Sequence, residues 1–420
     1  MAASFESYRR VLALPGAWVF SVSGLVARLP IAMVSLGIVL LVSNRTGSFG
    51  LAGAVAASFL VANAATGILL ARLIDGLGQH RVLPGAVAVF AAGLVGMMAA
   101  VEAGQSPPWP HVFAAVAGTG LPPIGSSIRA RWTHLVTDTQ DLHTAFAFES
   151  VLDEVVFIVG PALVTILAAT VHPLAGLSFA VVATVVGTAV LVTHTQSEPP
   201  TTSAQGDDHR PQMPWRVLIP MGTCAVVMGA LLGGTEVATT ALAGELGAAS
   251  LSGLMLGIWA AGSLVSAIIA GAVHPKAGNA ARFRRGLLAL GLSMLPLLVV
   301  DGFVSLGVLL FLSGFAISPT LIAAFAMLEE AVPRGRITEG ITLFTTGLGA
   351  GLAPGAGLAG MVVDRGGASA SFWVPVGAGI AGAAVAMLSG RGQHAMTTRT
   401  PDLSRGIAAR RHPRSSSHRG

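Results

Sequence analysis

The sequence predicts an all-α integral membrane protein, and its hydropathy, its charge content and its long apolar segments support this prediction. The chain has 420 residues, of which 53% are hydrophobic and 10% are charged, and its mean hydropathy is +0.75. A soluble domain of this size needs far more polar surface, since globular proteins are about 25% charged. The composition also excludes disorder as the main state, because disordered chains are poor in apolar residues. The composition therefore favours a chain whose main solvent is lipid.

Twelve long apolar segments follow one another along the chain. Each is close to the roughly 20 residues that a helix needs to cross the hydrocarbon core. The segments are continuously apolar, unlike the alternating strands of a membrane barrel, and a helix satisfies its own backbone polar groups in lipid. The predicted spans cover residues 14–42, 50–71, 83–101, 111–129, 145–170, 174–193, 217–241, 251–273, 283–300, 303–326, 339–362 and 371–389.

The distribution of basic residues predicts that both termini lie in the cytoplasm. With the N-terminus inside, the inner side receives 14 Lys and Arg residues before the C-terminal tail, whereas the outer side receives only Arg45 and Arg365. Cytoplasmic loops of membrane proteins carry such an excess. The same excess explains the sequence pI of about 10.8 without a nucleic-acid partner. We therefore expect a multi-pass protein of the cytoplasmic membrane, in contact with lipid and monomeric.

A polar stretch rich in Pro, Ser and Thr divides the chain into two halves. We predict an N-terminal six-helix bundle over 1–193, a flexible cytoplasmic linker over 194–216 and a C-terminal six-helix bundle over 217–389. Because six spans return the chain to the side on which it started, both halves have the same orientation in the membrane. We therefore expect them to be pseudo-symmetric about an axis along the membrane normal. Residues 390–420 contain seven Arg and little apolar sequence, which predicts a disordered basic cytoplasmic tail.

A short turn after the second span carries a family resemblance. Residues 71–81 read ARLIDGLGQHR, and with twelve spans and a central loop they resemble the major facilitator superfamily, in style closest to its bacterial drug-efflux members. The resemblance implies that Asp75 and Gly78 brace the cytoplasmic gate, although Asp75 could also simply solvate a tight turn. Gly160 and Pro161 match part of the antiporter pattern on the fifth span and are further gating candidates.

Charged residues inside the spans are the main mechanistic candidates, because a central Arg or Asp costs about 2.5–3.5 kcal/mol on insertion scales. Arg28 lies in the first span, and Asp153 and Glu154 lie in the fifth, with Glu149 nearer the inner interface. Two adjacent acids cannot cheaply both stay ionised without a cation. We predict that Arg28 pairs with Asp153 or Glu154 and that the other acid carries a proton. The alternative is a static ion pair that fixes the first helix against the fifth.

Further polar residues are candidates for lining a substrate path. Glu236 lies in the seventh span among threonines and is interpreted as a contact for a substrate cation, or alternatively as an acid that reaches the interface. Threonine and asparagine side chains at helical spacing form stripes on the second and eleventh spans. They can line a path or bond their own helix backbone. The candidates are Asn63, Thr66, Thr342 and Thr345.

No motif for catalysis is present in the sequence. It contains no phosphate-binding loop, no HExxH, no nucleophile elbow and only one cysteine, so we expect no enzyme activity, metal or cofactor. The predicted function is secondary active transport of a small-molecule substrate by alternating access, as proton-coupled export of an amphipathic compound. A metabolite importer or facilitator of the same fold and a non-transporting membrane sensor are the alternatives.

Overall fold

The protein is all-α throughout the part of the chain that the structure describes. The structure is a computed structural model that describes residues 8–46, 49–201, 212–247, 251–273, 277–300 and 302–397. Within these ranges nine helices are long and apolar enough to cross a membrane. The predicted all-α class is confirmed. The number of twelve spans and the orientation of the termini remain predictions, although each predicted span overlaps a helix.

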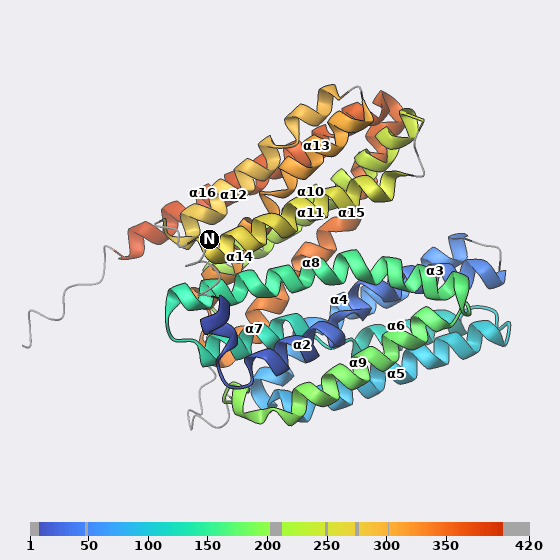
Figure 1. Ribbon diagram of the computed structural model, residues 1–420, viewed down its shortest axis with the longest axis horizontal. Coiled ribbons are helices and arrows are strands. Elements are labelled where there is room, and N and C mark those ends of the chain that lie inside the picture. Colours follow the sequence, from blue (N-terminus) through green and yellow to red (C-terminus); the bar gives the residue numbers. More distant parts are fainter. Residues whose placement is uncertain are drawn as a thin grey trace, which may run out of the picture.

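The helices gather into two groups that lie one above the other (Figure 1). We call the lower group the N-terminal half and the upper group the C-terminal half. The N-terminal half contains α2 (Ala17–Arg28), α3 (Pro30–Thr46), α4 (Phe49–Leu77), α5 (Gln79–Glu102), α6 (Trp109–Gly120), α7 (Ile124–Leu135), α8 (Thr139–Thr170), α9 (Ala175–Thr193) and the 3₁₀ turn η1 (Thr195–Ser197). The C-terminal half contains α10 (Trp215–Glu245), α11 (Ser252–Ala272), α12 (Asn279–Leu292), η4 (Leu295–Val299), α13 (Phe303–Gly314), α14 (Ile317–Ala331), η5 (Arg334–Arg336), α15 (Ile337–Ser371) and α16 (Trp373–Thr397).

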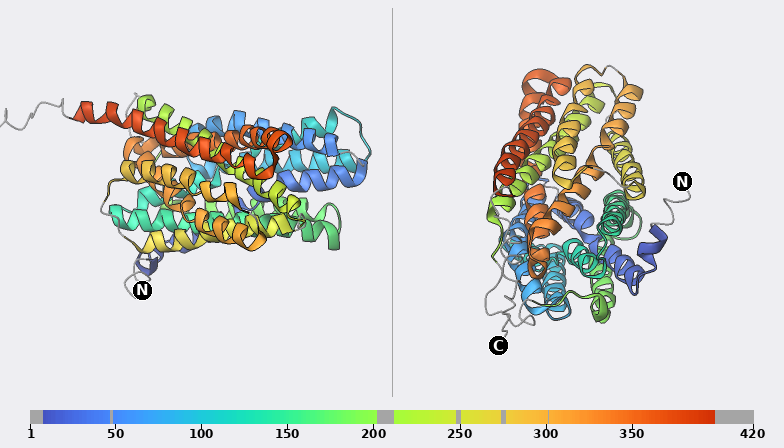
Figure 2. Two further views of the ribbon diagram at one scale, coloured as in Figure 1. Left: turned by 90° about the horizontal axis from the view of Figure 1, so that it is seen from above. Right: turned by 90° about the vertical axis from the view of Figure 1, so that its left-hand side faces the viewer.

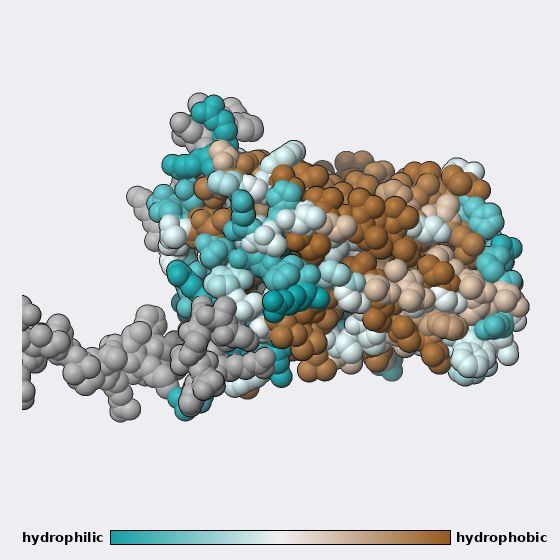
Figure 3. Space-filling view, turned by 90° about the horizontal axis from the view of Figure 1, so that it is seen from below, coloured by the Kyte–Doolittle hydropathy of each residue, from teal (hydrophilic) through white to brown (hydrophobic). Residues whose placement is uncertain are grey.

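The two halves meet through α8, which packs on α11 and α14, and through α15, which packs on α4 and α7. These helices approach one another at the end of the molecule where α9 ends and α10 begins, which we call the linker end (Figures 1 and 2). Toward the opposite end the helices of the two halves diverge (Figure 1). On the face that Figure 3 shows, hydrophobic residues cover much of the middle and hydrophilic residues gather toward the two ends, as expected for a membrane-spanning bundle.

Glycines allow α10 and α15 to pack with their backbones nearly touching. A Cβ atom on Gly229 would lie 1.9 Å from the Leu348 carbonyl oxygen, and one on Gly355 would lie 2.0 Å from the Ala230 carbonyl oxygen. Small residues permit such a close approach of two helices. Pro354 lies inside α15 without interrupting it, and the break in helical geometry is at Gly367, with a φ of 83°.

Several predicted spans differ in their bounds from the helices of the structure. The fourth span is split where residues 121–123 separate α6 from α7, because two consecutive prolines interrupt the helical hydrogen bonding. The fifth begins earlier than 145, since Asp138 caps α8 by accepting hydrogen bonds from Gln140 and Asp141. The helix of the ninth ends at Leu292 and gives way to a 3₁₀ turn. α16 continues to 397, so the predicted disordered tail is helical at its start; 398–420 lie outside the described residues.

The first part of the predicted flexible linker is held against the N-terminal half. Arg131 is fully buried, and its guanidinium donates to the His194 carbonyl oxygen (2.6 Å) and the Ser197 hydroxyl (2.7 Å). Glu198 accepts hydrogen bonds from the backbone and ring nitrogens of His80 at the start of α5. These hydrogen bonds attach residues 194–201 to the N-terminal half, because a buried charge needs such partners. Residues 202–211 lie outside the described residues.

Candidate functional site

The break between α2 and α3 places Arg28 inside the bundle. Pro30 has no backbone N–H, so the Val26 carbonyl loses its usual helical partner and instead accepts a hydrogen bond from Leu29. Arg28, the last residue of α2, is only 1% exposed, and its Nε donates to the Gly24 carbonyl oxygen at 3.2 Å. The remaining guanidinium nitrogens point toward α8. A charge this deeply buried requires partners of opposite sign.

Two carboxylates of α8 supply these partners. Arg28 Nη2 pairs with Glu149 Oε2, and Arg28 Nη1 lies 2.7 Å from Asp153 Oδ1. The two acids are four residues apart and therefore lie on one face of the helix. Glu149 is fully buried and also accepts hydrogen bonds from the Ser21 hydroxyl at 3.1 Å and the Trp132 indole at 2.9 Å. Its carboxylate is therefore surrounded by donors.

Arg129 provides a second buried cation that the sequence analysis had counted among the cytoplasmic basic residues. This Arg, on α7, is 2% exposed, and its Nη2 lies 2.6 Å from Asp153 Oδ2. The other face of its guanidinium lies over the Phe325 ring of α14, with 4.0 Å between the guanidinium carbon and the ring centroid. Arg28, Arg129, Glu149 and Asp153 thus form a charge-balanced quartet. The one local signal was the IRARW sequence, which places Arg129 and Trp132 on one helix face.

Glu154 follows the quartet in sequence but faces the C-terminal half. One residue further along a helix turns a side chain by about 100°. Glu154 Oε1 accepts hydrogen bonds from the hydroxyls of Ser263 on α11 and Ser318 on α14, and these hydroxyls are 2.8 Å apart. Among the described residues no basic side chain forms an ion pair with Glu154. Sequence reasoning missed both serines, which lie more than 100 residues away.

A second cluster joins the two halves at the linker end. The Asp75 carboxylate, on α4, accepts a hydrogen bond of 2.8 Å from the backbone N–H of Glu339, in the first turn of α15. The Glu339 carboxylate in turn pairs with Arg72 of α4 at 2.7 Å and with Arg336 at 2.6 Å. An acid at a helix N-terminus compensates unpaired N–H groups and the helix dipole. Asp75 therefore connects the halves through the end of α15.

The remaining candidates do not form one site. Thr342 is buried, and its hydroxyl lies 2.7 Å from that of Ser126 across the two halves. Thr345 is exposed, Asn63 is half-buried, and the Thr66 hydroxyl bonds the Ala62 carbonyl of its own helix. Glu236 is exposed on α10, and none of the described basic residues forms an ion pair with it.

The three other gating candidates have backbone or packing roles. Gly78 has a φ of 97° at the start of α5, a conformation that favours glycine. Gly160 lets α8 approach α3, where an added Cβ would lie 2.8 Å from Ala32 Cβ. Pro161 lies within the continuous helix α8. Within the described residues no group of His, Cys, Asp and Glu could hold a metal ion.

Comparison with known proteins identifies the family. The family model of the Major Facilitator Superfamily matches residues 20–311. The chain belongs to this superfamily. It is therefore a multi-pass membrane protein with a transporter fold, and the resemblance noted in the sequence is confirmed. No curated protein matches the chain.

Solved transporters share the fold of this superfamily member at low sequence identity. The human organic anion transporter MFSD10 (TETRAN) is 18% identical, with a TM-score of 0.70 over 89% of this chain and 99% of that one. A bacterial homologue of the iron transporter ferroportin in an outward-facing state is 14% identical, with a TM-score of 0.70 over 90% and 100%. FucP, in an outward conformation, is 13% identical, with a TM-score of 0.67 over 90% and 99%. These likenesses concern the fold alone.

Proposed function

We propose that the protein is a proton-coupled secondary transporter of the cytoplasmic membrane that exports a small amphipathic compound by alternating access. In this proposal the N-terminal and C-terminal halves rock about the region where α8 meets α11 and α14, and Glu154 carries the proton. Members of this superfamily act as transporters, which supports transport as the activity. No step requires bond-forming chemistry by the protein.

The charge balance around α8 is the observation that supports Glu154 as the proton-carrying residue. Arg28 and Arg129 pair with Glu149 and Asp153, so both carboxylates have partners of opposite charge. Among the described residues, Glu154 accepts hydrogen bonds from two serine hydroxyls and forms no ion pair. A carboxylate buried without a cation is costly, whereas the protonated acid is neutral and can still accept these hydrogen bonds. Glu154 is therefore the acid that most easily exchanges a proton with a bound or passing solute.

The position of Glu154 couples this proton to the motion of the halves. Its two serine partners belong to the C-terminal half, whereas the charge quartet lies largely within the N-terminal half. When α8 separates from α11 and α14, Glu154 loses the serines and gains access to water. Ionisation then becomes favourable, because water solvates the charge. Proton release would accompany the change of conformation.

In this proposal the conformation corresponds to the outward-facing state of the transport cycle. Bonds between the halves gather at the linker end, through Asp75, Glu339 and Thr342, and the helices diverge toward the other end (Figure 1). With the linker end in the cytoplasm, as the basic residues predict, the bonded end of the molecule faces the cytoplasm.

Flux through proteoliposomes tests the proposal. Purified full-length protein is reconstituted, and transport of a panel of amphipathic dyes, beginning with ethidium, is measured with and without an imposed pH gradient. We expect gradient-driven accumulation by the wild type and by Glu102→Gln, whose carboxylate lies in an exposed pair with Arg45. We expect Glu154→Gln to lose the dependence on the pH gradient while it retains dye exchange at equal concentrations.

Three results would count against the proposal. Gradient-driven transport by Glu154→Gln at the wild-type rate would show that Glu154 does not carry the coupled proton. Dye uptake that follows the proton influx would indicate an importer. No movement of any dye or metabolite in either direction would favour a non-transporting membrane sensor.

A further inference from the structure

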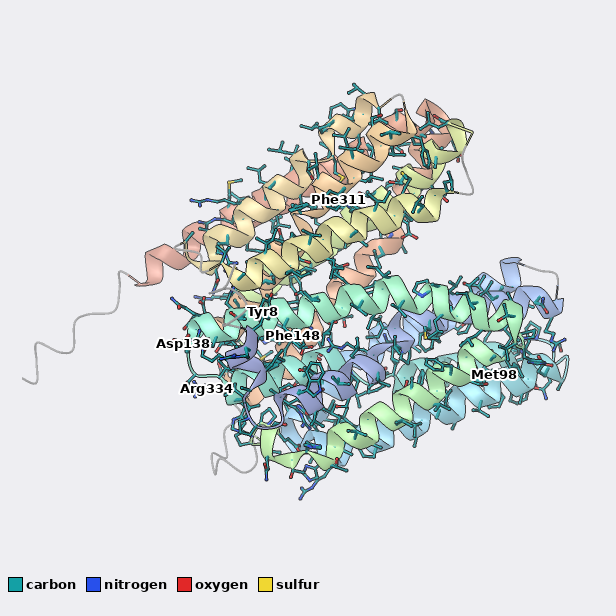
Figure 4. The ribbon with its side chains drawn as sticks, viewed as in Figure 1. Tyr8, Met98, Asp138, Phe148, Phe311 and Arg334 are labelled. Carbon is teal, nitrogen blue, oxygen red and sulfur yellow. The ribbon has the colours of Figure 1, made fainter. Side chains whose placement is uncertain are left out.

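The single tyrosine of the chain lies between the two halves at the linker end. Tyr8 stands in a short helical turn, 8–12, that precedes α2. Its hydroxyl donates to the carbonyl oxygens of Ile268 (3.1 Å) and Ala267 (3.4 Å) on α11. Its ring packs edge-on against Phe148 of α8, with 6.5 Å between the ring centroids (Figure 4). One side chain therefore contacts a helix of each half.

A glycine on α11 makes room for the hydroxyl. A Cβ atom on Gly271 would lie 1.9 Å from the Tyr8 hydroxyl oxygen and 2.9 Å from Ala147 Cβ. No real side chain tolerates such a distance, so only glycine permits this contact and the close approach of α8. The Thr144 hydroxyl of α8 donates to the Gly271 carbonyl oxygen at 3.1 Å and closes the slot from the other side.

The turn is attached more firmly to α8 than to α11. Besides the contact of Tyr8 with Phe148, Arg10 Nε lies 3.1 Å from Asp141 Oδ1 of α8. The chain also continues directly into α2 of the same half. If α8 and α11 separate, the turn stays with the N-terminal half, and the bonds from Tyr8 to α11 are the ones that break.

We propose that the turn 8–12 is a conformational clasp, in which Tyr8 occupies the Gly271 slot while the linker end is closed and leaves it when the halves separate there. This inference rests on the alternating-access motion of the proposed function, but it concerns neither the substrate nor the proton. In this inference the turn 8–12, which precedes α2, stabilises the conformation in which the linker end is closed.

The reactivity of the phenol reports on the clasp. Burial raises the pKa of Tyr8 from its usual 10.0 to about 12, so the phenolate is rare while the slot is occupied. A fall of two pKa units raises the phenolate fraction about 100-fold at a pH below both values. Tetranitromethane nitrates the phenolate and not the phenol. Because Tyr8 is the only tyrosine, the added nitro group measured by mass spectrometry reports on this residue alone.

The first experiment locks the linker end and measures nitration of the full-length protein in lipid nanodiscs. Ser126 and Thr342, whose hydroxyls lie 2.7 Å apart across the halves, are both changed to cysteine in a Cys224→Ser background. We expect the oxidised, cross-linked protein to be nitrated at least about tenfold more slowly than the Cys224→Ser parent, because the lock abolishes the open state. The parent is the reference because it has no thiol for tetranitromethane to oxidise. Equal rates in the cross-linked protein and in this parent would overturn the clasp.

The second experiment fills the slot. Gly271→Ala should expel the hydroxyl and raise the nitration rate up to about 100-fold over the cross-linked protein. Gly257→Ala is the matched control, because it lies on the same helix with nothing within 4 Å of an added Cβ, and it should nitrate at the wild-type rate. Unchanged nitration in Gly271→Ala would overturn the assignment of the slot. If Gly271→Ala does not fold, the cross-linking experiment decides alone.

These readouts separate the clasp from the proposed function. Nitration that follows the lock, without flux of any dye, would support the clasp and contradict export. Proton-driven dye flux with nitration that ignores the lock would support transport and contradict the clasp.

Discussion

Arg28→Met removes one cation from the charge-balanced quartet and leaves the buried Glu149 and the half-buried Asp153 with a single arginine. Arg28 is 1% exposed and Glu149 is fully buried, so water cannot readily replace the lost partner. Breaking a buried ion pair by removing one partner costs about 3–5 kcal/mol. Asp153 keeps Arg129, and Glu149 keeps the hydrogen bonds from Ser21 and Trp132. We therefore expect the lower figure, about 3 kcal/mol, which corresponds to a roughly 150-fold change in the unfolding equilibrium.

A double-mutant cycle isolates the charge effect from the loss of packing. Arg28→Met/Glu149→Gln restores the balance, because Arg129 and Asp153 then form a neutral pair. We expect the double variant to be more stable than Arg28→Met alone by about 1–3 kcal/mol, within the range of coupling energies for residues in contact. Unfolding of the detergent-solubilised protein by a graded fraction of SDS, followed by tryptophan fluorescence, measures each free energy.

An exposed ion pair supplies the control. Arg45 and Glu102 are 37% and 31% exposed, so Arg45→Gln should cost no more than about 1 kcal/mol. Additive free energies in the Arg28–Glu149 cycle, or an effect of Arg28→Met no larger than that of Arg45→Gln, would refute the argument that the quartet depends on charge balance.

Three further predictions concern contacts elsewhere in the molecule. Asp75→Asn weakens the cap on α15 and should destabilise the closed linker end by about 0.5–2 kcal/mol. In a Cys224→Ser background, a cysteine placed at Ser126 should then be alkylated faster. An unchanged alkylation rate would show that Asp75 does not hold the halves together. Gly355→Ala places a Cβ 2.0 Å from the Ala230 carbonyl oxygen and should lower the free energy of unfolding by at least about 1–3 kcal/mol. Gly357→Ala is the control, because an added Cβ there has open space around it. Equal thermal unfolding of the two variants would contradict the close packing of α10 on α15. Gly78→Ala places a Cβ 2.8 Å from Glu198 Oε1 at a residue with a φ of +97°. The substitution should therefore release residues 194–201 from the N-terminal half. A spin label at Thr195 that stays immobile would argue against the role of Gly78 in holding this segment.

The polar candidates were predictable as residues but not as contacts. A charge in an apolar segment stands out from its neighbours, so Arg28, Glu149, Asp153 and Glu154 could be selected from the sequence. Helical spacing also indicated that Glu149 and Asp153 share a face and that Glu154 points elsewhere. The partners could not be selected in this way. Arg28 and Glu149 are 121 residues apart, and Ser263 and Glu154 are 109 apart, so their contacts depend on the packing of whole helices.

Arg129 and the linker show where local interpretation was wrong. Arg129 stands at the end of an apolar segment, where an arginine usually reaches water, yet the packing of α7 against α8 and α14 buries it. Residues 194–201 are polar and rich in proline, which is typical of flexible linkers. They are nevertheless ordered, because the buried Arg131 uses their carbonyl and hydroxyl groups as hydrogen-bond acceptors.

The all-α membrane class, the family and the residues that are costly to bury were predictable from the sequence. Hydropathy and charge act locally, through the transfer of each segment from water to lipid, and so they can be evaluated along the chain. Which charges balance one another, which acids pair with no described basic residue and how Tyr8 and Asp75 connect the two halves depend on the packing of the helices. These outcomes depend on distances of a few ångströms between helices that are remote in sequence, and electrostatic and hydrogen-bond energies change steeply over such distances.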